Sequence, residues 1–218
     1  MQIGIIGGTG AEGRGLAARL AAASLPVQVG SRTIDRARET VERIRAANAS
    51  LPLTAASNDE VIEQSAIIFL AVPFAGAVEI VSTQAGRFKP GTLLVDLTVP
   101  LKFDGGVPAL ESIPEGSAAE HLRARLPPQV RMAATLKTVP AAVLGHVDMM
   151  LDCDEFVCGD SPETRAAVMD VLGRIPGLRL IDAGDLDASR TLERMTLLAI
   201  RINKRYRVRT ARFRVVGV

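Results

Sequence analysis

A chain of 218 residues with a formal net charge of +2 can form one large domain, or a full-sized domain with a small companion. Every stretch of about 18 residues is interrupted by a charge, a glycine or a proline, which excludes a membrane-spanning helix. The first apolar run, at residues 2–6, has neither a basic region before it nor a cleavage pattern after it, so we expect a cytoplasmic protein without a membrane partner.

The charge is unevenly distributed along the chain. Residues 201–218 carry seven basic residues and no acid, and subtracting these from 26 basic residues leaves 19 against 24 acidic ones in residues 1–200. A basic tail on an acidic body indicates an anionic ligand, an anionic partner or a subunit contact. If the tail is a strand, Arg205, Arg207 and Arg209 share one face, which favours a solvated edge or a dimer contact. We expect a homo-oligomer that acts on small molecules, and no nucleic-acid partner.

The cysteines and histidines do not form a recognisable site. Cys153 and Cys158 are the only cysteines, and without a secretory context a structural disulfide is not expected. Together with His121 and His146 they do not make a zinc-ligand set. Buried, reduced thiols are predicted, and no metal site.

In the first part of the chain, short β-rich runs alternate with segments of helical period. Strands are predicted at residues 2–6, 27–29, 53–55, 66–72 and 92–97, with helices after most of them. This alternation is typical of a parallel sheet covered by helices. Residues 98–116 are rich in proline and glycine, which predicts a long loop that would cover a site as a lid.

The second part continues the alternation with fewer strands. Residues 117–125 are predicted to be helical, 130–135 extended, and 140–144 the start of a short helix. Ser161 and Pro162 are a typical helix start. A strand at 178–181 and a final helix complete a second βαβ-like segment, and the final helix aligns Leu192, Met195, Ala199 and Ile202.

A glycine-rich motif lies between the first strand and the first helix. The run Gly8-Thr9-Gly10-Ala11-Glu12-Gly13 matches G-x-G-x-x-G, in the strand-to-helix context that the dinucleotide fingerprint requires. Gly8 would permit the tight turn, Gly10 the close approach of a diphosphate, and Gly13 the packing of helix on strand. Free N–H groups at the helix start would bind the diphosphate. Flexible glycines in a surface turn are the alternative interpretation.

The end of the second strand favours NADP over NAD. NAD enzymes normally carry an acid there for the adenosine ribose, whereas this chain has Gly30-Ser31-Arg32. Ser31 can donate to a 2′-phosphate, and Arg32 and Arg36, one helical turn apart, can bind it with planar guanidinium groups. An exposed basic helix start is the alternative.

These patterns predict a Rossmann-type, doubly wound, mostly parallel α/β sheet with a small, mainly helical C-terminal part. We expect an NADP-binding domain over residues 1–145 and a small substrate or dimerisation domain over residues 146–218, which includes the basic tail. Phe74 and Val78 follow the fourth strand and would form an apolar wall near the nicotinamide ribose, although core packing is an equally good interpretation. The cofactor itself carries hydride chemistry, so no catalytic residue is expected.

Several segments of the chain resemble the F420-dependent NADP reductases. These enzymes move hydride between NADPH and an 8-hydroxy-5-deazaflavin coenzyme, so the resemblance implies NADP and F420 as the two redox partners. The similarity extends to about residue 200. The matching segments are GIIGGTGAEGRGLAARL at 4–20, VGSR at 29–32, AVPF at 71–74, KTVPAA at 137–142, VCGD at 157–160 and GLRLIDAGDLDASRTLE at 177–193.

The resemblance, together with the motifs, gives a set of expected site residues. Those expected to bind NADP are Gly8, Thr9, Gly10, Ala11, Glu12, Gly13, Ser31, Arg32, Arg36, Val72, Pro73, Phe74, Val78, Val139 and Ala141, with Val139 and Ala141 near the nicotinamide. Those expected to contact the deazaflavin are Lys137, Arg190 and Thr196. The chain departs from the archaeal members of the family at Lys137, where they carry His, at Arg194, and in the basic tail.

Two alternatives to this function stay open on the sequence. One is an NADPH-dependent reductase of a flavin, an imine or another small acceptor that uses the same cleft. The other is a non-catalytic redox sensor that binds NADP(H) and signals through the basic tail.

Overall fold

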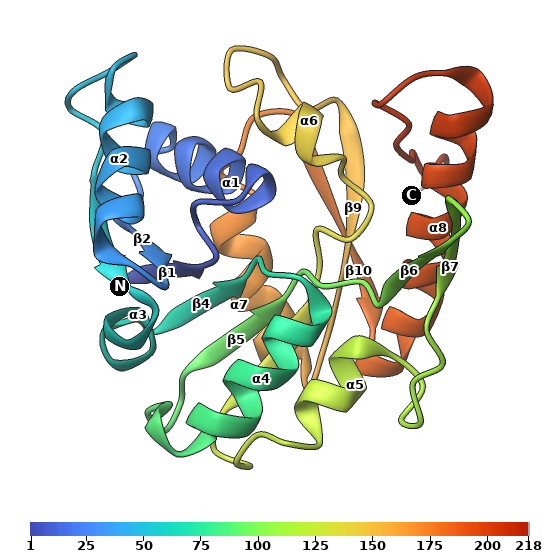
Figure 1. Cartoon of the computed structure of the whole chain (residues 1–218), viewed down its shortest axis with the longest axis horizontal. Coiled ribbons are helices and arrows are strands. Elements are labelled where there is room, and N and C mark those ends of the chain that lie inside the picture. The colour runs from blue at the N-terminus through green and yellow to red at the C-terminus, as the bar shows by residue number, and fades with distance from the viewer. Residues whose placement is uncertain (218) are drawn as a thin grey trace.

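The protein is built on one large sheet with helices on both faces (Figure 1), and the computed structural model describes residues 1–217. The strands of this sheet are β1 (Ile3–Ile6), β2 (Val27–Ser31), β3 (Leu53–Ser57), β4 (Ile67–Leu70), β5 (Leu93–Asp96), β8 (Arg131–Ala134), β9 (Cys153–Gly159) and β10 (Leu178–Gly184). The helices are α1 (Ala11–Ala22), α2 (Ile34–Arg45), α3 (Asn58–Gln64), α4 (Phe74–Gln84), α5 (Ala118–Arg123), α6 (Ala141–Leu144), α7 (Pro162–Leu172) and α8 (Ser189–Tyr206). Two short 3₁₀ helices span Ala85–Arg87 and Leu186–Ala188.

The order of the strands indicates where on the sheet a ligand is expected to bind. The order is β10-β9-β8-β5-β4-β1-β2-β3, and among the strands of this sheet, as described for residues 1–217, only β8 and β9 pair in the antiparallel direction. The chain winds outward from β1 to β3 and then crosses back to β4 on the other side of β1. Ligands of such sheets bind beyond the carboxyl ends of the strands at this switch point. The predicted doubly wound, mostly parallel α/β fold is confirmed.

Alternate residues of each inner strand enter two separate cores. Ile3 and Ile5 of β1 pack against Leu16 and Leu20 of α1 on one face of the sheet. Ile6 points to the opposite face, where the second core is built with α3, α4, α5 and α8. This period of two along buried strands makes both faces apolar, which is why helices cover both of them.

The segment 98–116 is not the structureless loop that its composition predicts. It folds into an antiparallel hairpin of β6 (Leu101–Asp104) and β7 (Val107–Leu110), which lies beside α8 (Figure 1). Gly105 and Gly106 form the two-residue turn with φ values of +53° and +79°. Paired glycines suit such a tight hairpin turn, so the glycines mark a hairpin where we expected a loop. Its action as a lid stays a prediction.

The C-terminal region departs from expectation at its end. The final helix continues to Tyr206, and Arg207 closes it in a left-handed conformation with φ +54°. The strand interpretation of residues 205–209 is therefore wrong. Strands β9 and β10 extend the same sheet as β8, and a domain boundary after residue 145 stays a prediction.

Two compositional expectations can be compared with the fold. Cys153 and Cys158 are both buried, free thiols, as predicted. Within residues 1–217, none of the helices combines the length and the hydrophobicity that crossing a bilayer requires.

Candidate functional site

The glycine-rich turn joins β1 to α1 at the switch point of the sheet. Gly7 has φ +78°, and a Cβ there would lie 2.4 Å from the carbonyl oxygen of Ala71. The residue of the turn with left-handed backbone conformation is therefore Gly7. The motif predicted this role for Gly8, the next residue. A Cβ on Gly13 would lie 2.5 Å from the Gly7 carbonyl oxygen, so Gly13 lets the helix start pack on the turn. A Cβ built on Gly10 would have its nearest neighbour, the Gly7 carbonyl oxygen, at 3.4 Å, so the surroundings of Gly10 are less crowded than those of Gly7 and Gly13.

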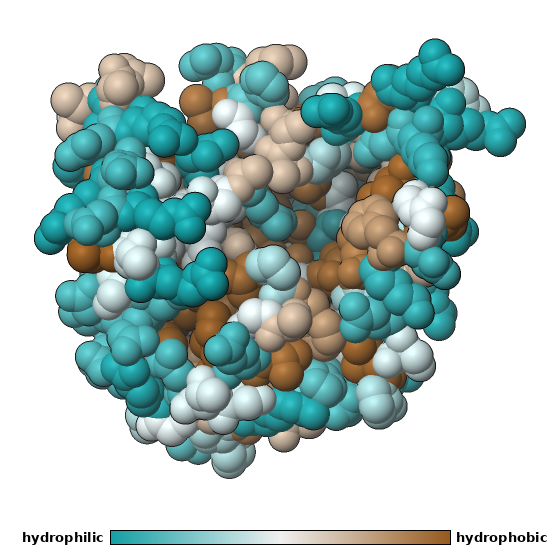
Figure 2. Space-filling model, viewed as in Figure 1, coloured by the Kyte–Doolittle hydropathy of each residue, from teal (hydrophilic) through white to brown (hydrophobic). Residues whose placement is uncertain are grey.

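Two neighbouring cavities share part of their lining at this turn, and together they are here called the cleft. The cavity on the β2 side, here called the basic cavity, has a volume of about 650 Å³, and the cavity on the α8 side, the apolar cavity, has about 480 Å³. Gly10, Ala71, Val72 and Pro73 line both of them. Figure 2 shows the corresponding hollow at the centre of the molecule, with hydrophobic residues in its depth.

The basic cavity carries the three residues proposed for phosphate recognition. Ser31 ends β2 and is buried, while Arg32 and Arg36 are exposed, and all three line the cavity. Within residues 1–217 neither arginine side chain makes a hydrogen bond or an ion pair, whereas the neighbouring Arg38 pairs with Asp35 at 3.1 Å. Two unpaired guanidinium groups beside a serine hydroxyl fit a phosphate, which accepts bidentate hydrogen bonds.

Residues at the start of α3 also line the basic cavity, and the sequence patterns did not predict them. Asn58 and Asp59 line it. Ser57 caps the helix, since its Oγ accepts from the Glu60 amide at 3.2 Å and its own amide donates to the Glu60 carboxylate at 2.7 Å. The signal was present as S-x-x-E, a capping box directly after a weakly marked strand.

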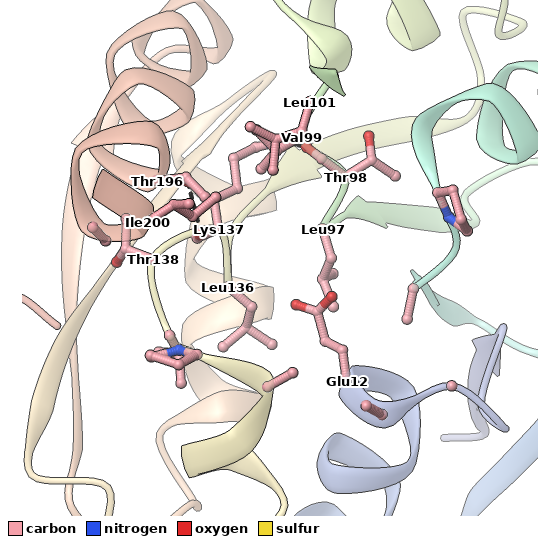
Figure 3. A pocket seen from close by; sticks show the side chains of 18 of the residues that line it. Glu12, Leu97, Thr98, Val99, Leu101, Leu136, Lys137, Thr138, Thr196 and Ile200 are labelled. Carbon is pink, nitrogen blue, oxygen red and sulfur yellow. Dashed lines mark hydrogen bonds between the residues drawn. The ribbon is translucent and has the colours of Figure 1, made fainter. Parts of the chain in front are cut away.

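The apolar cavity lies between α1, the loop after β8, the hairpin and α8 (Figure 3). Leu97, Leu136 and Ile200 are among the apolar residues that line it. Phe74 also lines it, and the Phe74 ring meets His121 of α5 edge to face with centroids 5.6 Å apart. An apolar slot with few polar groups suits a flat ring system. Thr196 of α8 was expected here, and it lines the cavity. The other lining residues of α8, and Leu101 of the hairpin, were not predicted, because their positions depend on tertiary packing.

Glu12 brings a carboxyl group into the apolar cavity. Figure 3 shows its side chain projecting from the start of α1 toward Leu97 and Leu136. Burial, and in second place the charge of Glu155, raise the pKa of Glu12 to about 8. Glu12 therefore carries its proton at neutral pH and can donate a hydrogen bond.

Lys137 belongs to a buried charge cluster, which we define as Asp96, Lys137, Glu155 and Glu193. The Lys137 Nζ lies 2.8 Å from Asp96 Oδ2 and 3.5 Å from Glu193 Oε1, and it also donates to the Thr98 carbonyl oxygen. Burial acts to lower the pKa of Lys137, but the two carboxylates outweigh it and the pKa is raised. The ammonium is thus held inside the protein, and a contact with the acceptor stays a prediction.

Glu155 anchors the loop after β8 that forms one wall of the apolar cavity. Its carboxylate accepts from the amides of Lys137 and Thr138, each at 3.2 Å, and from the Thr138 hydroxyl at 2.7 Å. Leu136 in the same loop has φ +54°, a strained value for a leucine. Thr196 of α8 ties the loop from the other side by donating to the Lys137 carbonyl oxygen at 2.7 Å.

We expect Glu155 to make stability depend on pH. Burial raises the pKa of Glu155 from 4.5 to about 7, so its contribution to stability is complete below pH 4.5 and is lost as the pH rises through 7. The shift corresponds to a loss on the order of 3 kcal/mol. Urea denaturation at pH 5 and pH 8 measures it, with Glu155→Gln as the variant that cannot ionise. The wild type should lose more stability than the variant over this interval, and an equal loss in both proteins contradicts the assignment.

Four of the expected site residues lie outside both cavities, namely Gly8 and Gly13 of the glycine-rich turn, Val78 and Arg190. Arg190 stands at the start of α8 and donates from Nε to Glu120 at 2.7 Å, and it also bonds the Glu115 carbonyl oxygen at 3.2 Å. Val78 packs against the second core on the α4 side of the sheet. Their roles in binding stay predictions. The other expected residues all lie in the glycine-rich turn or line the cleft.

Comparisons with known proteins identify the family of this chain. Residues 2–100 match the family model described as NADP oxidoreductase, coenzyme F420-dependent. The F420-dependent NADP reductases of Methanothermobacter marburgensis and Methanothermobacter thermautotrophicus are 32% and 31% identical to the whole chain, which covers 99% and 96% of their lengths. A crystal structure from Arthrobacter sp. FB24, described as a candidate F420-dependent NADP reductase, shares the fold over both complete chains with a TM-score of 0.83 at 23% identity. The full-length similarity to the archaeal enzymes shows that the chain belongs to the family of F420-dependent NADP reductases.

Proposed function

We propose that this protein transfers hydride between NADPH and the deazaflavin coenzyme F420. The proposal rests mainly on the cleft, in which two neighbouring cavities share the glycine-rich turn. One cavity carries two arginines that have no partner within residues 1–217, and the other is apolar. A phosphorylated dinucleotide needs a cationic end, a turn with free amides and an apolar end, in that order. Membership of the reductase family supports F420 as the acceptor in the apolar cavity.

In this arrangement each segment of the cleft binds one part of NADP. The amides from Thr9 to Glu12 would hold the diphosphate at the start of α1, and Ser31, Arg32 and Arg36 would hold the 2′-phosphate. Val139 and Ala141, which line the apolar cavity, would contact the nicotinamide. Bound NADPH supplies the hydride, so the protein has mainly to align two rings and exclude water.

The expected acceptor contacts have unequal support. The Thr196 side chain lines the apolar cavity, and Lys137 lines it as part of the loop after β8. Arg190 is bound to Glu120 in this structure, so a contact with the acceptor would require that ion pair to open.

The test is a direct assay. Purified protein is mixed with NADPH and oxidised F420, and the absorbance of each redox partner is followed. We expect NADPH oxidation and F420 reduction with equal stoichiometry. Binding of NADP without any change in F420 would reject the acceptor and keep the dinucleotide site.

Glu12 should make NADPH binding depend on pH. Its carboxyl has a pKa of about 8 and lies in the first turn of α1, where we place the diphosphate. Below that pH the group is neutral, whereas above it a carboxylate repels the diphosphate. Affinity for NADPH should therefore fall by up to roughly tenfold per pH unit above the pKa, because binding then requires proton uptake.

Fluorescence titration with NADPH from pH 6.5 to about 9.5 measures this effect. Glu12→Gln keeps a neutral hydrogen-bonding side chain of the same size and should bind NADPH equally at both ends of the range. The same pH dependence in wild type and variant would place the titrating group elsewhere.

We further propose a cytoplasmic protein that forms oligomers of identical chains. Apolar side chains that a subunit could cover are exposed on the hairpin and on α8, with Phe103 65% and Tyr206 69% exposed. Sedimentation of the purified chain distinguishes a monomer from an oligomer.

A further inference from the structure

Arg19 is a buried arginine whose partners are all main-chain carbonyl groups. It lies in α1 and is only 4% exposed. Its Nε donates to the Leu144 oxygen at 2.7 Å, and its Nη2 lies 3.1 Å from the Val143 oxygen, 2.6 Å from the His146 oxygen and 3.0 Å from the Met149 oxygen. Within residues 1–217 the side chain forms no ion pair with a carboxylate, so these carbonyl groups replace the water that burial removes.

The four carbonyl groups belong to one short segment at the end of α6. A helix of four residues is too short to be stable alone, and its last carbonyl groups have no partner within the helix. Arg19 supplies donors to these groups and also places a positive charge at the negative end of α6. The position of α6 therefore depends on Arg19.

Gly15, one turn before Arg19 on α1, makes the same contact possible. A Cβ on Gly15 would lie 2.9 Å from the Gly145 nitrogen and 2.9 Å from the Leu144 carbonyl carbon. The two backbones approach so closely that only glycine fits at this place. Gly15 and Arg19 together fix the distance and the direction of α6 relative to α1, and we name this contact the α1–α6 clamp.

The clamp lies directly behind the apolar cavity. Val139, Pro140 and Ala141 line that cavity and lead straight into α6, whereas neither Gly15 nor Arg19 lines any part of the cleft. The basic cavity is lined by the glycine-rich turn and by residues of β2, α2, α3 and α4, and the Arg19 side chain donates its hydrogen bonds to the segment after Pro140 and to none of these. A change at Arg19 can therefore reach the ring end of the cleft without reaching the phosphate end.

We infer that Arg19 is a positioning residue for the nicotinamide, which it serves by holding the segment 139–145 through the carbonyl groups of α6. The inference rests on the proposed function, because it assumes that the nicotinamide binds in the apolar cavity. Arg19 touches neither ring and acts only through the main chain.

The affinities of the Arg19 variants for two ligands distinguish a positioning role from a purely structural one. Adenosine 2′,5′-bisphosphate occupies only the phosphate end, whereas NADP occupies both ends. In Arg19→Met we expect unchanged affinity for the bisphosphate, weaker binding of NADP, and a kcat that falls between roughly tenfold and a hundredfold, the size expected when reacting groups are misplaced by about 1 Å. Arg19→Lys keeps a donor to some of the carbonyl groups and should recover part of the loss.

Gly15→Ala changes the other residue of the α1–α6 clamp and should give the same pattern of affinities and kcat. It replaces Arg19→Met as the test if Arg19→Met does not fold. Arg14→Met, on the same helix but outside the clamp, is the matched control and should bind both ligands like the wild type. Equal weakening of both ligands, or no weakening of NADP in a folded variant, overturns the inference. Failure of the wild type to reduce F420 would reject the acceptor only, since the comparison of two nucleotides does not use F420.

Discussion

Replacement of both Arg32 and Arg36 by alanine is expected to raise the KM for NADPH by roughly a hundredfold or more, because each charge-assisted contact with a phosphate is worth about 1.5–3 kcal/mol. The KM for NADH should stay nearly unchanged, since NADH has no 2′-phosphate. Both arginines line the basic cavity and neither is neutralised by a carboxylate within residues 1–217, so no ion pair has to be broken when a phosphate binds. Steady-state kinetics with the two dinucleotides measures the effect.

A suitable control lies on the same helix. Arg38 is exposed, pairs with Asp35 and does not line the cavity, so Arg38→Ala removes one positive charge without touching the phosphate site. We expect this variant to keep the wild-type preference for NADPH. If the double variant loses NADH and NADPH equally, the arginines do not bind the 2′-phosphate and the NADP preference must arise elsewhere.

The second large effect is expected at Lys137. Substitution by methionine, which fills a similar volume, leaves Asp96 and Glu193 buried without their cation. Both carboxylates are buried, with a side-chain exposure of 0% for Asp96 and 3% for Glu193. Removal of one partner from a buried ion pair typically costs about 3–5 kcal/mol of unfolding free energy. Urea denaturation at pH 7 should show a loss of this size.

A second substitution tests the cause of that loss. Asp96→Asn in the Lys137→Met background removes one of the two stranded charges and should restore part of the stability. Lys102→Met, on the exposed strand β6, controls for the loss of a lysine and should have little effect. A loss below about 1 kcal/mol in Lys137→Met would show that the cluster contributes no more than an exposed ion pair.

The fold was predictable from the sequence because its signals are local. Buried strands such as β4 are runs of apolar residues, and the helices between them repeat their apolar residues with helical period. The run Gly8 to Gly13 and the residues at the end of β2 indicated the dinucleotide site for the same reason, since a phosphate-binding turn is made by consecutive residues. Only the left-handed position was misplaced, because a further glycine, Gly7, precedes the motif.

The hairpin shows where composition misleads. Paired glycines and prolines in residues 98–116 predicted a loop, since such residues interrupt regular structure. Gly105 and Gly106 instead form a tight turn. Strand β7 packs along α8, and no local sequence pattern predicts this contact. A two-stranded ribbon is only marginally stable by itself, so its existence depends on that distant helix.

The sequence by itself determined the alternation of strands and helices and the chemistry of the phosphate end, because each of these depends on residues that are neighbours in the chain. The order of the strands, and with it the switch point, came from the tertiary structure. Only the tertiary structure decided the apolar end of the cleft, where α1, the loop after β8, the hairpin and α8 meet from positions up to about 200 residues apart. It also decided the state of the charged groups there. The family resemblance made Lys137 a candidate contact for the deazaflavin. In the fold its ammonium group is buried beside Asp96 and Glu193. Arg19 reads as one more arginine on a helix, yet the fold surrounds it with carbonyl groups at the end of α6.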